Sequence, residues 1–150
     1  MSNDAKDLKS LGSDRTDYPN AGGVDASVLE AFPNPFEDND YNIHLETAEF
    51  TSLCPKTQQP DFAKITVDYI PKDKCIESKG FKLYMFSFRS EGAFMERITN
   101  TILNDLVALV DPKWMRVVGD FAPRGGVGLV VEAIYNENGP SVTTVDGDVS

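Results

Sequence analysis

A cysteine and an aspartate lie in one short segment, Phe50–Phe62, in an arrangement that could carry out nucleophilic chemistry. Cys54 stands near its start and Asp61 near its end, with Pro55 and Pro60 between them. A thiol becomes an effective nucleophile when its surroundings favour the thiolate, and a reaction that builds up negative charge needs a nearby acid. Because proline fixes the backbone φ angle, a loop with two prolines can present both groups to one small substrate. The alternative is a buried, inert cysteine and an aspartate that caps a turn or helix.

The charge of the chain favours a small anionic partner over a polymer. The formal net charge is −10, which argues against a broad nucleic-acid surface, because such binding relies on Lys and Arg to neutralise phosphates. Five of the fourteen basic residues nevertheless fall within one short stretch, at Lys72, Lys74, Lys79, Lys82 and Arg89. A confined basic strip suits a phosphorylated dinucleotide, and a solvated helix face is the alternative.

Length and composition predict one domain between two polar ends. A chain of 150 residues with 41% hydrophobic residues can form one core. We expect a flexible arm at 1–25, the domain at 26–139 and a flexible tail at 140–150. No apolar run approaches the roughly 20 residues of a membrane span, so we expect a cytoplasmic protein. Cys54 and Cys75 are too few for a disulfide scaffold, and a reducing compartment suits a free thiol nucleophile.

Hydrophobic periodicity predicts four strands, with two helices between the second and the third. In chain order we expect strands at 41–50 and 65–70, helices at 77–89 and 94–110, and strands at 114–123 and 127–135. The first helix is ambiguous, since its aromatic residues also fit a strand, whereas the second has a clear four-residue stripe that Pro112 closes. This ββααββ order predicts an α+β fold, an antiparallel sheet with two helices on one face.

Three segments together resemble one enzyme family. Phe50–Phe62, Glu77–Tyr84 and Pro123–Gly126 are similar to segments of the single-module NADPH-dependent 7-cyano-7-deazaguanine reductases, the nitrile reductases of queuosine biosynthesis, a tRNA modification pathway. The resemblance covers about 28–139. It implies the tunnelling fold (T-fold), in which subunits join their sheets into a ring, two rings stack, and active sites form between subunits. It also implies a small-molecule substrate, with no nucleic-acid or membrane partner.

The resemblance gives Cys54 and Asp61 their roles. Cys54 would attack the nitrile carbon to form a covalent thioimide, and Asp61 would protonate the nitrogen. Asp61 must then hold a proton when it is needed, so we expect burial or a neighbouring anion to favour its protonated form. Two NADPH molecules would complete the reduction to 7-aminomethyl-7-deazaguanine.

Substrate contacts follow from the same resemblance. It implies that Ile76, Glu77 and Ser78 lie against the deazaguanine, and that Glu96, after Phe94, accepts hydrogen bonds from its guanine-like edge. The alternative for Glu77 is an exposed helix start with this residue in the first turn.

Cofactor contacts are expected on the basic strip. The resemblance places NADPH against Lys79, Lys82 and Tyr84, and the two lysines, three residues apart, would project from one side of a helix. Gly80 stands where the family usually has serine or alanine. Arg124 lies in a glycine-rich run that lacks the spacing of a phosphate loop, so we interpret the run as a turn or bulge with Arg124 as a phosphate contact.

One residue departs from the family at the site itself. Met95 stands where the family usually has histidine, and methionine cannot donate a proton. Either Met95 packs on the substrate ring or turnover suffers. A deazaguanine-binding protein with weak turnover therefore stays open. So does a related amidinotransferase acting on deazaguanine in tRNA, which the resemblance implies would share the cysteine–aspartate pair but lack the NADPH segment. His44, the only histidine, is expected at the surface or an interface, and no Cys/His cluster predicts a metal site.

Overall fold

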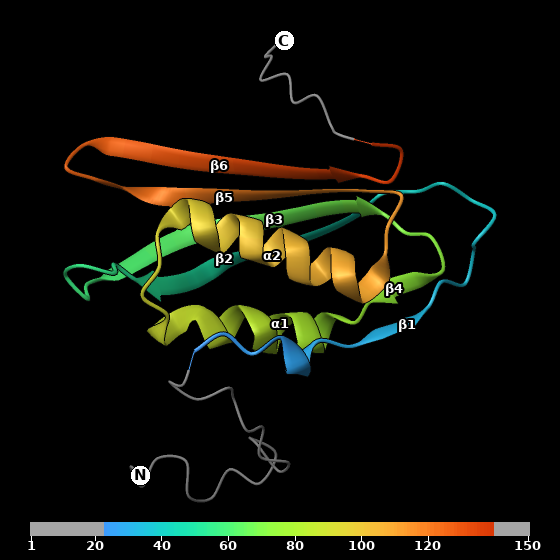
Figure 1. Cartoon of the computed structure of the whole chain (residues 1–150), viewed down its shortest axis with the longest axis horizontal. Coiled ribbons are helices and arrows are strands. Elements are labelled where there is room, and N and C mark those ends of the chain that lie inside the picture. The colour runs from blue at the N-terminus through green and yellow to red at the C-terminus, as the bar shows by residue number, and fades with distance from the viewer. Residues whose placement is uncertain (1–22, 140–150) are drawn as a thin grey trace, which may run out of the picture.

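The structure is a computed structural model that describes residues 23–139 as a four-stranded sheet with two helices on one face (Figure 1). The sheet is antiparallel, in the order β2-β3-β5-β6, and a small antiparallel pair, β1-β4, lies beside it. The strands are β1 (Ala31–Pro33), β2 (Ile43–Leu53), β3 (Pro60–Ile70), β4 (Lys74–Ile76), β5 (Trp114–Arg124) and β6 (Val127–Asn136). The helices are α1 (Ser78–Phe86) and α2 (Met95–Val110), with 3-10 turns η2 (Ala26–Val28) and η3 (Ser87–Ser90). The predicted α+β class is confirmed.

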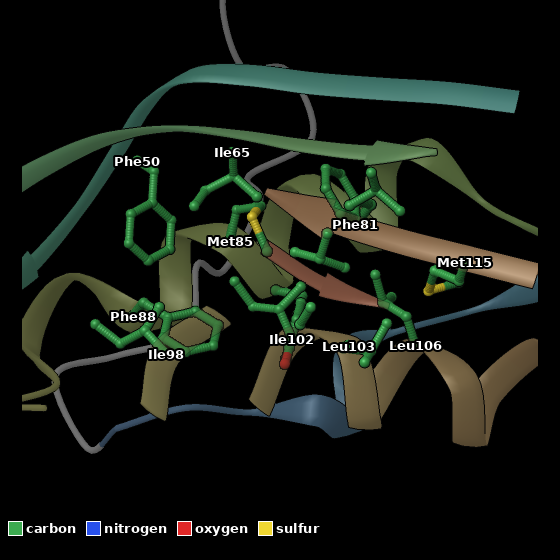
Figure 2. Packing of buried hydrophobic residues seen from close by; sticks show 14 of the residues in the cluster. Phe50, Ile65, Phe81, Met85, Phe88, Ile98, Ile102, Leu103, Leu106 and Met115 are labelled. Atoms are coloured by element: carbon green, nitrogen blue, oxygen red, sulfur yellow. The ribbon is translucent and has the colours of Figure 1, made fainter. Parts of the chain in front are cut away.

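The core lies between the helices and the sheet (Figure 2). Alternate residues of β3 face inward and are buried, so one side of the strand is apolar from Ala63 to Tyr69. The predicted stripe of α2 faces them, with Ile98, Ile102 and Leu106 at most 1% exposed. Asp61 has the same parity as Ala63, so the strand turns this carboxylate toward the helix side of the sheet.

Two features of the fold differ from the prediction. β1 and β4 were missed because strands of three residues are too short to show a period. The predicted loop across Phe50–Phe62 was too long, because β2 runs to Leu53 and β3 begins at Pro60. Only 54–59 connect the strands, and Asp61 is a strand residue.

Two residues of the predicted N-terminal arm pack against the domain. Val24 packs against the core, and the Asp25 amide donates a 3.0 Å hydrogen bond to Ser87 Oγ. The rest of the predicted arm and the predicted tail at 140–150 lie outside the described residues. Within 23–139, no helix is both long and apolar enough to cross a membrane.

Gly80 allows η2 and the residues just after it to approach α1 closely. A Cβ atom there would lie 2.8 Å from the Val28 carbonyl oxygen and 3.0 Å from the Glu30 amide nitrogen. Both neighbours are backbone atoms, so glycine fits this contact better than the serine or alanine usual in the resembling family.

Candidate active site

The β2–β3 hairpin presents Cys54 at one end of the sheet. The Cys54 amide donates to the Gln59 carbonyl (2.8 Å), and the Gln58 amide donates to the Cys54 carbonyl (2.9 Å). Gln58 has a φ of 61°, the left-handed conformation that lets the chain reverse within these few residues. The hydrogen bonds fix the backbone on both sides of the thiol, which is half-buried.

The surroundings of Cys54 favour its thiolate. Its pKa falls to about 7, chiefly because the Thr57 hydroxyl hydrogen-bonds to the sulfur, with further help from the amides of Thr57 and Lys56 and from the Arg124 guanidinium. Burial acts in the opposite direction and is outweighed. Hydrogen bonds to a charged form stabilise that form, so near neutral pH a substantial share of Cys54 is nucleophilic.

Asp61 is buried but faces a cation. Its side chain is 6% exposed, and its Oδ1 lies 2.9 Å from Arg124 Nε. Arg124 Nη2 also donates to Gln59 Oε1 (3.3 Å) and to the Pro60 carbonyl (3.5 Å), which ties it to the Cys54 hairpin. The sequence predicted burial or a neighbouring anion for Asp61. The structure shows burial, and the charged neighbour is the Arg124 guanidinium.

Arg124 reaches Asp61 from the β5–β6 hairpin. The glycines after it take positive φ angles, 57° at Gly125 and 80° at Gly126, as a two-residue turn of this twist requires. A register shift between Phe121 and Arg124 redirects the end of β5. The prediction of a turn or bulge is confirmed, but Arg124 binds Asp61 here and is not free to serve as the predicted phosphate contact.

The start of α2 lies at the same end of the sheet as Cys54. The Leu53 amide donates to the Glu91 carbonyl (2.9 Å) and the Ala93 amide donates to the Leu53 carbonyl (3.3 Å), so the segment before α2 runs alongside the end of β2. Figure 1 shows the β2–β3 loop, the β5–β6 turn and the start of α2 together at one end of the molecule.

The residues at this helix start are exposed to different degrees. Phe94, before the helix, is 60% exposed, and Glu96 in the first turn is exposed, so both can reach a ligand. Met95 is half-buried and packs against the hydrophobic core. Its core contacts favour a packing role over a proton-transfer role for this position.

The predicted substrate residues on β4 and α1 lie at the opposite end of the sheet. The Ile76 amide donates to the Tyr69 hydroxyl (2.8 Å), and Tyr69 follows Asp61 by eight residues in β3. At about 3.3 Å per strand residue, the two ends are separated by about 26 Å. One chain therefore does not bring Ile76 and Cys54 to the same small molecule. The Ile76 side chain is itself buried, at 5% exposed.

Glu77 caps helix α1. Its carboxylate accepts hydrogen bonds from the amides of Lys79 (2.9 Å) and Gly80 (2.8 Å), and these bonds lower its pKa. Glu77 thus precedes the first turn, contrary to the alternative that placed it within that turn. Ser78, the next residue, is exposed.

A groove of about 660 Å³ runs between β2 and α1. Its cationic lining residues are Lys82 and Arg89, with Ser78 on the same side of the helix. Arg89 stacks over the Phe86 ring, 4.4 Å from the ring centre. Lys79 does not line the groove, so the two predicted lysines do not share one pocket.

Tyr84 does not support the predicted cofactor contact. Its side chain is 0% exposed, and its hydroxyl donates a 2.5 Å hydrogen bond to Asp105 Oδ2. Burial, followed by the Asp105 bond, raises its pKa. In this structure Tyr84 belongs to the core contact between α1 and α2.

His44 lies outside the site, as expected. Its Nδ1 lies 2.8 Å from Asp68 Oδ1 and its Nε2 lies 3.1 Å from Glu46 Oε1, and the bond to Asp68 is the main reason its pKa is raised. Asp68 follows Asp61 by seven residues in β3, which is about 23 Å. Across the described part of the chain, no group of three His, Cys, Asp or Glu residues could hold a metal ion.

Two residues of the site were missed by sequence reasoning. Thr57 hydrogen-bonds to the thiol, and no periodic pattern marks it. Ser52 is fully buried opposite Asp61 in the β2–β3 register. The two-residue spacing of Phe50, Ser52 and Cys54 could have indicated that Ser52 faces the same side as the thiol.

Comparison with known proteins decides the family. Residues 60–140 match the family model described as QueF-like protein. A NADPH-dependent 7-cyano-7-deazaguanine reductase from Desulfovibrio desulfuricans is 56% identical over 85% of this chain and 76% of its own length. Another so named, from Neisseria meningitidis serogroup B, is 49% identical over 90% of this chain and 85% of its own. The chain belongs to this reductase family.

A solved structure of the same fold supports the reductase family's T-fold for this chain. The archaeosine synthase QueF-Like, in the apo form, superposes with a TM-score of 0.59 and 26% identity over 62% of this chain and 91% of its own. The fold expected from the family resemblance is thereby confirmed.

Proposed function

We propose that this chain reduces the nitrile of 7-cyano-7-deazaguanine to an aminomethyl group with two NADPH, in queuosine biosynthesis. The observation that carries this proposal is the half-buried Cys54, whose pKa is about 7, beside the Asp61–Arg124 ion pair. Thioimide formation needs a sulfur that attacks the nitrile carbon and a carboxyl group that passes the thiol proton to the nitrogen, and Cys54 and Asp61 are the two candidates. The reductase names of relatives at 49–56% identity supply the substrate and cofactor.

The first step uses only residues of this chain and the substrate. The Cys54 sulfur attacks the nitrile carbon, an S–C bond forms, and one π bond of the nitrile becomes a lone pair on nitrogen. That nitrogen takes a proton from Asp61, which has taken it from the Cys54 thiol, so the step consumes no external proton. Arg124 Nε lies 2.9 Å from Asp61 Oδ1 and is placed to hold this carboxyl group in position for the transfer.

The groove between β2 and α1 is the proposed cofactor site. Glu46 and Glu49 of β2 line it together with two cationic side chains of the kind that a phosphorylated dinucleotide requires, Lys82 and Arg89. We propose both as phosphate contacts, and Lys79, exposed near the start of α1, as a weaker one. When bound, NADPH supplies the hydrides that reduce the substrate while Cys54 anchors it.

The substrate site is proposed to form between two subunits. Phe94 and Glu96 lie at the Cys54 end of the sheet, whereas Glu77 and Ser78 lie at the opposite end. Both sets can meet one deazaguanine only if two copies contribute. The edge strands β2 and β6 offer unpaired backbone groups for joining sheets, which supports the ring expected of this family.

The deciding experiment follows NADPH absorbance with and without 7-cyano-7-deazaguanine. A reductase consumes two NADPH per aminomethyl product and nothing without the nitrile. Conversion of cyano-deazaguanine in tRNA without NADPH would instead indicate an amidinotransferase, a function favoured by the fold shared with archaeosine synthase. Substrate binding with no NADPH oxidation would indicate a deazaguanine-binding protein.

A further inference from the structure

We propose that Ser52 is a positioning residue for Asp61, resting on the function proposed above. Its hydroxyl would bind the Asp61 carboxyl group when that group moves from Arg124 toward the substrate nitrogen. The inference comes from an unpaired hydroxyl and from its place in the sheet.

The Ser52 hydroxyl is buried without a hydrogen-bond partner. Ser52 is 0% exposed, and its Oγ is the one buried side-chain nitrogen or oxygen among residues 23–139 that lacks a partner. Ser87, equally buried, shows the usual arrangement, since its Oγ donates to the Tyr84 carbonyl (2.6 Å) and accepts from the Asp25 amide (3.0 Å). A buried hydroxyl left unpaired is unfavourable, so Ser52 is better explained by a partner it acquires in another state of the site.

The sheet places that partner directly across from it. Ser52 and Asp61 are paired in the β2–β3 register, and both face the helix side of the sheet. Side chains opposite each other on one face have Cβ atoms about 4.5–5.5 Å apart, so rotation of either side chain can bring hydroxyl and carboxyl into contact. Cys54 follows Ser52 by two residues, which places the reacting sulfur next to this pair.

A hydroxyl suits both protonation states of Asp61. It donates to the carboxylate that awaits the thiol proton, and it accepts from the carboxylic acid that forms when the proton arrives. Arg124 can only donate, and therefore serves only the carboxylate. Ser52 would thus hold Asp61 in place while Asp61 carries the proton from Cys54 to the nitrile nitrogen.

The test compares thioimide formation in Ser52→Ala, Ser52→Thr and Ser87→Ala by stopped-flow absorbance, at rising 7-cyano-7-deazaguanine and without NADPH. We expect Ser52→Ala to lower the limiting rate roughly tenfold or more, with little change in the half-saturating concentration. Ser52→Thr, which keeps the hydroxyl, should recover most of the rate. Ser87→Ala should lower the melting temperature but leave the rate unchanged, whereas Ser52→Ala should not lower the melting temperature.

The outcomes separate this inference from the function on which it rests. A wild-type protein that forms no Cys54 adduct would contradict the proposed function itself. A wild-type adduct with an equal limiting rate in Ser52→Ala would overturn only the role of Ser52. A loss of rate in Ser52→Ala that only matches the loss of folded protein would also overturn the role of Ser52, because a serine with a purely structural role would give that result.

Discussion

Asp61 and Arg124, on different hairpins, form an ion pair of 2.9 Å at one end of the sheet. Arg124 also helps to lower the pKa of Cys54, so one guanidinium acts on both groups proposed to handle the substrate. The same side chain therefore contacts the carboxyl group proposed to relay the proton and favours the thiolate form of the cysteine that must lose it.

Replacing Arg124 should slow thioimide formation. Arg124→Ala leaves the Asp61 carboxylate buried without its cation and removes one stabilising contact of the Cys54 thiolate. We expect the rate of adduct formation at pH 7 to fall roughly tenfold or more, in line with loss of a charge-assisted hydrogen bond. Arg116→Ala, which removes a cation paired with Glu132 elsewhere on the sheet, is the matched control. Equal rates in the two variants would contradict the role of Arg124.

Replacing Thr57 should raise the pKa of Cys54. The Thr57 hydroxyl is the main cause of the lowered value of about 7, so Thr57→Val should move the pH midpoint of Cys54 alkylation upward, toward an ordinary thiol at about 8.5. At pH 7 the thiolate fraction, and with it the alkylation rate by iodoacetamide, should then fall. Thr66→Val, on β3 and not among the residues that shift the Cys54 pKa, should keep the original midpoint. A midpoint unmoved by Thr57→Val would show that the hydroxyl does not stabilise the thiolate.

The β2–α1 groove should separate cofactor use from adduct formation. Lys82→Ala and Arg89→Ala should each weaken NADPH affinity about tenfold, because a charge-assisted contact contributes about 1.5–3 kcal/mol. Lys79→Ala should have a smaller effect, because Lys79 does not line the groove. Adduct formation, measured without NADPH, should be unchanged in all three. A parallel loss of adduct would place these residues in the substrate pocket or the fold.

Met95→His tests the departure from the family. General acid–base assistance is worth roughly 10²–10⁴-fold, so a restored imidazole that delivers protons should measurably speed reduction of the preformed Cys54 adduct. Because Met95 packs against the core here, we expect the substitution to be neutral or harmful in single-turnover measurements across pH. A faster rate with a new pH dependence would show that proton delivery at this position limits the natural protein.

The sequence predicted the helices and strands that are long enough to show several repeats of a hydrophobic pattern. It did not predict the three-residue strands or the contacts between residues far apart in the chain. The spacing of apolar residues predicts α2, β3 and β6, because the residues that face the core must recur at the period of a helix or a strand. The three-residue β1 carries no period.

In the candidate site, too, the sequence predicted residues that lie in one local segment and missed contacts between distant residues. Cys54 and Asp61 were found through a local segment, whereas the Arg124 contact joins residues 63 positions apart and depends on the pairing of β3 with β5. Tyr84 was misassigned because a helix position in a basic strip does not reveal which side faces the core.

The measurement that tests the account most directly is the intact mass of the protein after mixing with 7-cyano-7-deazaguanine in the absence of NADPH. Thiolate attack needs no hydride, so the wild-type protein and Cys75→Ala should each gain the mass of one substrate, with the absorbance of a thioimide. Cys54→Ala should gain nothing, and Cys75, 2% exposed, should not replace it. An adduct that persists in Cys54→Ala, or a wild-type protein that forms none, would contradict the account.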